Sequence, residues 1–238
     1  MYKKHPLALA GLASILATTA SSQGALLAYW DQNSNSLPNN PSSFGFITTA
    51  FPQSADQGSG SLSLADFDTT TVTIGGTDEV FDYIESFGGT DLNAQPSIVA
   101  GGSLSPQGGA SNSNNGMSII LRVSTSGFTD VVVSWDQRGT ATGFTSRAFD
   151  YSTDGINWTN FDTDSGALTS TWVTEEYDLS AISAIEDQSS VYFRIVLDGA
   201  TATTGNNRFD NLTVTAVPEP TVALLGAFGL LGLVRRRR

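Results

Sequence analysis

The chain has 238 residues, no cysteine, a single histidine and a net charge of −12. Its lysines lie near the N-terminus, and the central residues 24–216 hold five arginines against 22 aspartates and glutamates, which gives that part a net charge of −17. The composition of this part excludes disulfides, thiolate or imidazole metal sites, Schiff-base lysines and Ser-His-Asp triads, and charge repulsion disfavours a nucleic-acid partner.

Residues 1–24 have the build of a secretory signal peptide. Lys3 and Lys4 precede an apolar run at residues 7–17, and small polar residues follow. This order of basic, apolar and small residues is typical of an export signal, with cleavage expected near Gly24 or, alternatively, near Ala20. The other interpretation, a core helix, is disfavoured because the lysines of the chain occur only here.

The central part, residues 25–216, is predicted to be one all-β domain. Short runs rich in Val, Ile, Thr, Phe and Tyr are bounded by Gly, Asn, Asp and Ser, and Asp154-Gly155 predicts a hairpin turn. Residues 33–43 and 95–115 are predicted as loops, and residues 178–188 as at most a short helical turn. The pattern favours an antiparallel β-sandwich, jelly-roll-like. The predicted strands are residues 26–31, 61–64, 70–74, 80–87, 117–124, 129–136, 147–152, 172–179, 191–197 and 208–214.

The last 22 residues carry a second signal. An apolar stretch at residues 221–234 is about 21 Å long as a helix, short against a hydrocarbon core of roughly 30 Å. It lies between the motif Val217, Pro218, Glu219, Pro220 and the cluster Arg235, Arg236, Arg237, Arg238, which predicts a stop-transfer signal on the cytoplasmic side.

This tail, residues 217–238, resembles the PEP-CTERM sorting signal. The resemblance implies a Gram-negative bacterium that makes exopolysaccharide, and a precursor tethered transiently to the inner membrane by the short hydrophobic helix. It also implies that an exosortase processes the chain near Pro-Glu-Pro and that the product reaches the cell surface or extracellular matrix. The alternative is an ordinary single-pass tail anchor.

The central part resembles carbohydrate-binding, MAM and laminin-G-like jelly-roll modules in residues 26–33, 148–161 and 191–214. Modules of this kind often hold a structural calcium ion where the first and last strands meet. The matching positions are Asp31 and Asp210, with Asn211 and Asp198 as further candidates. The alternative is that Asp210-Asn211 forms local hydrogen bonds. No other cofactor is expected.

The central part also contains side chains of the types that bind sugars or catalyse their hydrolysis. Trp158 is the tryptophan expected to stack on a glycan, whereas a tryptophan in a sandwich more often packs in the core. Adjacent Glu175 and Glu176 point to opposite faces of a strand and form no catalytic pair. Asp162 and Asp164 are interpreted as a solvated turn. Ion pairing on the sandwich is expected of the arginines at positions 122, 138, 147, 194 and 208.

Taken together, the sequence predicts an exported, non-enzymatic surface or matrix protein with a structural or adhesive role and an association with exopolysaccharide. The alternative is a dedicated carbohydrate-binding module, and a glycan-active enzyme is the least favoured function.

Overall fold

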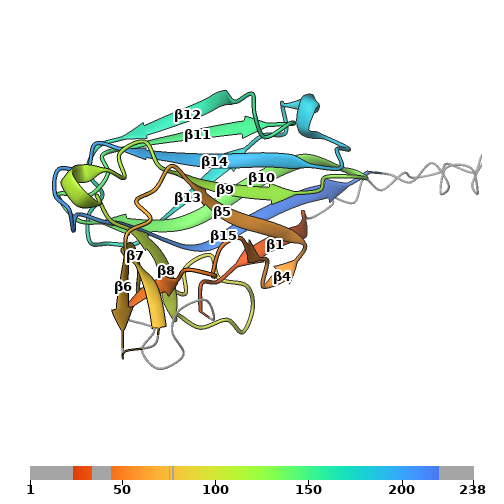
Figure 1. Cartoon of the computed structure of the whole chain (residues 1–238). Coiled ribbons are helices and arrows are strands. Elements are labelled where there is room, and N and C mark those ends of the chain that lie inside the picture. Colours follow the sequence, from red (N-terminus) through yellow and green to blue (C-terminus); the bar gives the residue numbers. More distant parts are fainter. Residues whose placement is uncertain (1–23, 34–43, 75, 77, 220–238) are drawn as a thin grey trace, which may run out of the picture.

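The computed structural model describes residues 24–33, 44–74, 76 and 78–219. In this part the chain folds into two antiparallel β-sheets packed face to face, with two short 3₁₀ helices, Ala110–Asn112 and Ser183–Ile185 (Figure 1). The predicted fold class, an all-β, jelly-roll-like antiparallel sandwich, is confirmed. The predicted helices of the signal peptide and of residues 221–234 lie outside the described residues.

The smaller sheet has six strands. In spatial order they are β12 (Thr159–Ser165), β11 (Ser146–Ser152), β14 (Val191–Asp198), β9 (Ser118–Val123), β5 (Gly60–Ala65) and β3 (Gln53–Ser54).

The larger sheet is centred on its longest strands. Its main order is β13 (Val173–Asp178), β10 (Phe128–Gly139), β15 (Asn207–Pro218), β8 (Gly102–Pro106), β7 (Asp78–Gly88) and β2 (Phe44–Ile47). In addition, β1 (Ala25–Trp30) pairs with β15 and with β4 (Gln57–Gly58), and β6 (Thr71–Ile74) pairs with β7.

Alternation along β14 shows why the sheets pack as they do. Its residues Val191, Phe193, Ile195 and Leu197 are buried between the sheets, as the alternation predicts, whereas Tyr192, Arg194 and Val196 face outward and stay half-buried. Strand neighbours repeat this pattern, so each sheet has one apolar inner face and one polar outer face.

The core contains an aromatic cluster that joins the two sheets. Phe149 of β11 stacks on Tyr177 of β13, with ring centroids 4.4 Å apart, and Tyr177 stacks on Trp135 of β10 at 5.2 Å. Trp135 is 1% exposed, and burial of a large apolar side chain contributes roughly 2–3 kcal/mol. This cluster holds β11 of the smaller sheet against β10 and β13 of the larger sheet.

Two predictions of loops are wrong. Strand β8 lies inside the segment 95–115, where its serines pack between β15 and β7 although serine has little intrinsic preference for strands. Strand β12 contains Asp162 and Asp164, which were predicted to lie in a turn, and it forms the edge of the smaller sheet.

Both ends of the sandwich chain lie side by side. Ala25 at the start of β1 pairs with Ala216 of β15, and β15 continues through Val217 and Pro218, two residues beyond the predicted domain boundary. The Glu219 N–H then donates to the carbonyl oxygen of Gly127 at 2.9 Å. Pro220 and the arginine cluster at residues 235–238 lie outside the described residues.

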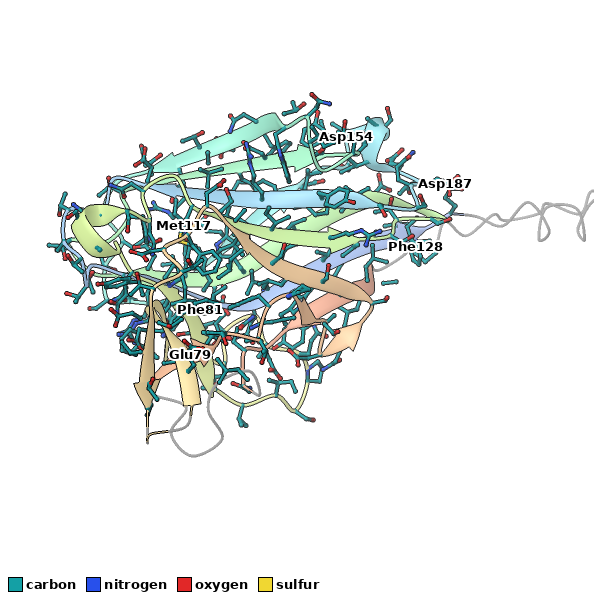
Figure 2. The ribbon with its side chains drawn as sticks, in the orientation of Figure 1. Glu79, Phe81, Met117, Phe128, Asp154 and Asp187 are labelled. Atoms are coloured by element: carbon teal, nitrogen blue, oxygen red, sulfur yellow. The ribbon has the colours of Figure 1, made fainter. Side chains whose placement is uncertain are left out.

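Figure 2 places Phe128 and Asp187 at the end of the molecule where β15 finishes. Among the described residues, no helix is long and apolar enough to cross a membrane.

Candidate functional site

The outer face of the smaller sheet carries polar and aromatic side chains in rows that run across the strands. Pairing registers place residues of four neighbouring strands, β5, β9, β14 and β11, directly beside one another on this face. One row is Ser61, Arg122, Tyr192 and Ser152, and the next is Ser63, Ile120, Arg194 and Asp150.

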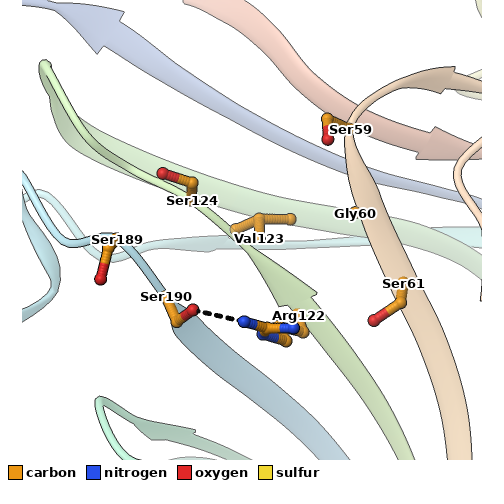
Figure 3. Close-up of a pocket in the computed structure, with 8 residues that line it drawn as sticks. All are labelled: Ser59, Gly60, Ser61, Arg122, Val123, Ser124, Ser189 and Ser190. Atoms are coloured by element: carbon orange, nitrogen blue, oxygen red, sulfur yellow. Dashed lines mark hydrogen bonds between the residues drawn. The ribbon is translucent and has the colours of Figure 1, made fainter.

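A polar hollow of about 310 Å³ opens at the Arg122 end of this face (Figure 3). Arg122 is exposed in it and donates from Nη2 to the hydroxyl of Ser190 at 2.8 Å. Besides Arg122, Gly60 and Val123, the hollow is lined by Ser59, Ser61, Ser124, Ser189 and Ser190. Five hydroxyls beside one guanidinium supply both donors and acceptors of hydrogen bonds.

Tyr192 connects the hollow to the middle of the face. The guanidinium carbon of Arg122 lies 5.7 Å from the Tyr192 ring centroid, within cation–π range. On the neighbouring hairpin, Gly155 approaches so closely that a Cβ there would be 3.2 Å from the ring. Tyr192 is therefore held by contacts from two elements and remains half-buried.

Trp158 lies next along the face and is itself half-buried. The guanidinium carbon of Arg194 sits 4.3 Å from its ring centroid, and Arg194 Nη2 forms an ion pair with Asp150 at 2.8 Å. Asn160 donates to the other Asp150 oxygen at 2.9 Å. One ring face of Trp158 is thus occupied by Arg194, and stacking on a glycan stays a prediction for this residue.

The turn between β11 and β12 is locked by Asp154 (Figure 2). Its carboxylate accepts the backbone N–H groups of Ile156 and Asn157, both at 2.8 Å, and the Asn157 side-chain amide at 2.7 Å. These hydrogen bonds, led by that from the Asn157 side chain, hold the pKa of Asp154 well below its usual range. The predicted Asp154-Gly155 turn is confirmed, and Gly155 has a φ of +73°.

The other tryptophans lie away from this face. Trp30 and Trp135 are 0% and 1% exposed and belong to the core, as expected of most tryptophans in a sandwich. Trp172 is half-buried beside the larger sheet, where the guanidinium carbon of Arg138 lies 5.6 Å from its ring centroid.

The predicted calcium ligands lie at the larger sheet. Asp210 of β15 is 1% exposed, and its two carboxylate oxygens accept the N–H groups of Thr90 at 2.7 Å and Asn211 at 2.8 Å. Burial raises its pKa to about 8, and the charges of Asp136 and Asp31 add to this effect.

Asp31 follows β1 and accepts the N–H of Asn33 at 2.9 Å. Asp198 ends β14 in the other sheet, where its carboxylate accepts the N–H of Gly199. Asp31 is thus close enough to Asp210 for its charge to raise the pKa of Asp210, whereas Asp198 lies on the smaller sheet.

Asn211 occupies the centre of the polar cluster around Asp210. Its amide nitrogen donates to the carbonyl oxygens of Thr90 at 3.0 Å and Leu92 at 2.8 Å, and to Asp136 at 3.1 Å; its amide oxygen accepts the hydroxyl of Tyr29. Carbonyl and carboxylate oxygens are ligands that a hard cation such as Ca²⁺ prefers, but here they accept hydrogen bonds from the Asn211 amide. In the described part of the chain, no group of three or more His, Cys, Asp and Glu is placed to hold a metal.

The geometry around Asp210 and Asn211 thus fits the hydrogen-bonded alternative rather than an open cation site. Calcium binding by Asp31 and Asp210 stays a prediction.

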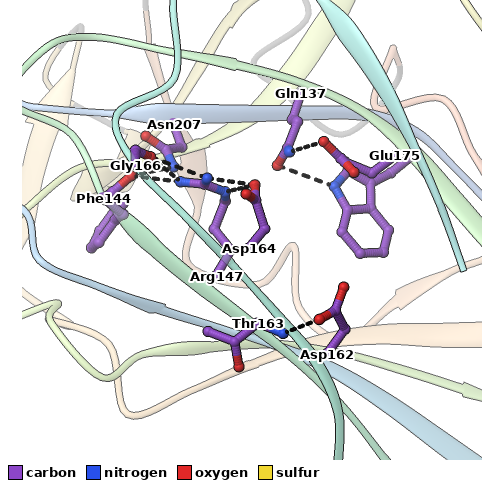
Figure 4. Close-up of polar contacts among 10 residues, drawn as sticks. Gln137, Phe144, Arg147, Asp162, Thr163, Asp164, Gly166, Glu175 and Asn207 are labelled. Atoms are coloured by element: carbon purple, nitrogen blue, oxygen red, sulfur yellow. Dashed lines mark hydrogen bonds and ion pairs between the residues drawn. The ribbon is translucent and has the colours of Figure 1, made fainter.

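Two of the carboxylates that the sequence offers for catalysis, Asp164 and Glu175, bind side chains of the protein itself (Figure 4). Asp164 pairs with Arg147, whose Nε lies 3.0 Å from it, so the prediction that Asp164 is a solvated turn residue is wrong. Glu175 accepts Gln137 at 2.9 Å, whereas Glu176 is exposed, which confirms that these neighbours point to opposite faces.

Asp136 and Asp210 do face each other on β10 and β15. They are 0% and 1% exposed, so no substrate reaches them in this conformation.

Comparisons with known proteins give no close relative. No protein-family model matches the chain, and neither does any curated protein sequence at a significant level. Among solved structures, a carbohydrate-binding module of family 61 in complex with β-1,4-galactotriose is 9% identical with a TM-score of 0.38, over 64% of this chain and 86% of that one. The xylan-binding module of family 15 is 11% identical with a TM-score of 0.38, over 66% and 98%.

The enzymatically active domain of tailspike protein 4 from bacteriophage CBA120 is 8% identical with a TM-score of 0.39, over 66% of this chain and 19% of that one. These TM-scores lie below 0.5, so the similarity does not show what this chain binds.

Proposed function

We propose that this chain is a non-enzymatic polysaccharide-binding protein that uses the outer face of its smaller sheet. The observation that supports this best is the serine-lined hollow around Arg122, continuous with Tyr192 in the same cross-strand row. Sugar hydroxyls form paired hydrogen bonds with guanidinium and hydroxyl groups, and the apolar faces of sugar rings pack on aromatic rings.

The side chains around Tyr192 on this face are fixed by contacts with other residues of the protein. Arg194 is fixed between Trp158 and Asp150, and the Asp154 turn fixes the hairpin that contacts Tyr192. Side chains already held in place lose less conformational entropy when a ligand binds. We infer that the face binds an extended glycan with little rearrangement.

Binding is tested by titrating purified exopolysaccharide from the producing cells, and a glycan array, against the protein. We expect Arg122→Ala to weaken binding about tenfold or more, because it removes the one charged donor of the hollow. Glu176→Ala, an exposed change on the outer face of the other sheet, is the matched control and should leave the affinity unchanged. If no glycan binds, or if Arg122→Ala binds as the wild type does, the proposal is wrong.

We propose further that the protein is exported and sorted by the PEP-CTERM route to the cell surface or matrix, where binding gives it a structural or adhesive role. Support comes from Val217, Pro218, Glu219 and Pro220 with the following apolar stretch and arginines. Pro218 and Glu219 are exposed at the end of the last strand, where a processing enzyme has access. Mass spectrometry of the protein from hosts with and without an exosortase tests this, and an identical C-terminus in both hosts would contradict it.

A further inference from the structure

Two arginines occupy paired positions on neighbouring strands, on the outer face of the larger sheet. The proposed glycan site lies on the other sheet. Arg138 of β10 and Arg208 of β15 are directly paired in the strand register, and both are half-buried. Like charges placed directly opposite each other in a sheet destabilise it. The central part of the chain has 22 acidic residues that could pair with arginine, yet these two arginines lie beside each other.

Each of the two guanidinium groups packs on an aromatic ring. The guanidinium carbon of Arg138 is 5.6 Å from the ring centroid of Trp172, which directly precedes β13. That of Arg208 is 4.5 Å from the ring centroid of Phe87 on β7. Because β10 lies next to β13, and only β8 separates β15 from β7, the two side chains reach in opposite directions across the sheet.

Small residues make this reach possible for Arg208. Strand β8 presents Ser103 and Ser105 between β15 and β7, and both are fully buried. The two serine hydroxyls bond to each other at 3.0 Å, and the Ser103 hydroxyl also donates to the Phe87 carbonyl at 2.9 Å. The result is a line of aromatic ring, guanidinium, guanidinium and aromatic ring across five neighbouring strands.

Neither guanidinium has a carboxylate partner among the described residues. Arg147 and Arg194 form ion pairs, with Asp164 and Asp150. The Arg208 side chain donates from Nε to Asn206 at 3.3 Å, and no described residue accepts a hydrogen bond from Arg138. Burial and the positive charge of Arg138 both lower the pKa of Arg208. Stacking occupies the flat face of a guanidinium and leaves its in-plane N–H edge open to a ligand.

On β10 and β15, the carboxylates nearest to the two arginines accept hydrogen bonds from other groups of the protein. Asp136 accepts the Thr174 hydroxyl at 2.6 Å and the Asn211 amide, and Asp210 accepts the N–H groups of Thr90 and Asn211. Neither forms an ion pair with Arg138 or Arg208. Glu85 of β7 lies in the same cross-strand row as Arg208, beyond Ser105, and it forms no ion pair with Arg208 either. With no ion pair to a described carboxylate, the two arginines keep positive charge available to an external anion.

We propose that Arg138 and Arg208 form a second binding site, which takes the carboxylate groups of a uronic-acid polysaccharide. Guanidinium groups bind carboxylates in a planar, bidentate fashion. The two reach apart over a distance on the order of two strand spacings, about 10 Å. Such a separation suits carboxylates carried on different sugars of one chain, whereas a single small anion needs donors that converge. The site is independent of the hollow at Arg122.

The test is a titration of the full-length protein, kept in mild detergent, with polygalacturonate. We expect Arg138→Gln and Arg208→Gln each to weaken binding about tenfold or more, because each removes one bidentate contact. Fully methyl-esterified galacturonan, which lacks the charge, and poly-L-glutamate, which carries carboxylates without sugars, should both bind at least about tenfold more weakly than polygalacturonate. Glu176→Ala, an exposed change on the same outer face that leaves both arginines in place, is the control and should bind polygalacturonate as the wild type does.

Several outcomes would overturn the proposal. Wild-type affinity in either Gln variant, no binding of polygalacturonate, or equal binding of poly-L-glutamate would each do so. Loss in Arg122→Gln without loss in the Arg138 and Arg208 variants would assign the polymer to the hollow instead and leave the proposed function standing. If a Gln variant unfolds, Arg208→Lys keeps the charge but not the planar fork, and should still weaken binding severalfold.

Discussion

At the scale of single residues, Asp210 has the clearest consequence for stability. Its pKa is 3.8 in an exposed setting and about 8 in the fold, because burial disfavours the charged form. Between these values the folded state holds a proton that the unfolded state has lost. Stability from this group is therefore fully present below about pH 4 and is lost as the pH rises through about 8. Asp136, with a pKa raised to about 6 by burial, acts in the same direction.

The Asp210→Asn variant removes this titration, since asparagine does not ionise, but it also replaces one of the two oxygens that accept N–H groups by an amide nitrogen. We expect the variant to be less stable than the wild type near pH 4, and the wild type to lose more of its free energy of unfolding than the variant between pH 4 and pH 8. Urea denaturation at both pH values measures this. If the two proteins lose stability in parallel, Asp210 is ionised in the fold.

The same residue tests the calcium prediction. A cation that binds Asp31 and Asp210 would stabilise their ionised form and raise the melting temperature at about pH 8. We expect the hydrogen-bonded cluster around Asn211 to make that effect small, below about 1 °C. A large rise in wild type that is absent in Asp210→Asn would establish the ion instead.

Arg147 is the buried arginine on which local stability depends. It is 3% exposed, pairs with Asp164, and donates to the carbonyl oxygens of Phe144 and Gly166 (Figure 4). Arg147→Ala leaves Asp164 and the Gly166 carbonyl oxygen without this donor, whereas the Phe144 carbonyl oxygen keeps the Asn207 amide. We expect the change to reduce the free energy of unfolding by about 3 kcal/mol. Arg122→Ala, at an exposed position, is the control and should change it by less than about 0.5 kcal/mol. Equal effects in urea denaturation would refute the structural role.

Residue types alone could not reveal these partnerships. The sequence predicts that the arginines form ion pairs, and this is confirmed for Arg147 and Arg194. For Arg122, Arg138 and Arg208 the prediction is wrong among the described residues. Arg122 donates to Ser190 instead, and the side-by-side placement of Arg138 and Arg208 depends on the register of β10 and β15. The register of β10 and β15 shifts near Asn211, which has a φ of +51°. This shift places Arg138 opposite Arg208, and no local sequence pattern predicts it.

At the scale of elements, the β11–β12 hairpin couples local conformation to the proposed glycan face. Gly155 has a positive φ, and a Cβ at this position would lie 3.2 Å from the Tyr192 ring. Gly155→Ala should cost about 1 kcal/mol of stability and displace Tyr192, so that glycan affinity falls as well. Gly166→Ala is a useful control, since φ is also positive there but open space surrounds the residue. It should cost similar stability and leave affinity unchanged.

Elements with strong side-chain patterns are the ones that the sequence predicts. Strand β14 alternates fully, and Asp154-Gly155 carries its own turn chemistry, so both are confirmed. Strands β8 and β12 are rich in Ser, Asp, Thr or Gly and owe their conformation to neighbouring strands. The sequence does not predict the candidate hollow for the same reason. Its serines lie in or just before β5, directly after β9 and directly before β14, and only the fold brings these segments together.

At the scale of the whole molecule, β1 and β15 decide where the two predicted signals attach. Since Ala25 pairs with Ala216, the chain enters and leaves the sandwich at one end. The two outer faces run away from that end on opposite sides of the core. A sandwich tethered through its last strand would therefore hold both faces accessible to polymer at once.

The two proposed glycan sites lie on opposite faces, so a polyuronate that binds both would be cross-linked by the protein. We expect the wild type to raise the viscosity and light scattering of a polyuronate that both faces bind, because each molecule then joins two chains. Arg122→Ala and Arg208→Gln should each abolish this cross-linking while retaining single-site binding in titrations, and the double variant should lose both. Glu176→Ala should behave as the wild type. Cross-linking that persists in either single variant would mean that one face, or self-association, is sufficient, and the two-face arrangement would be wrong.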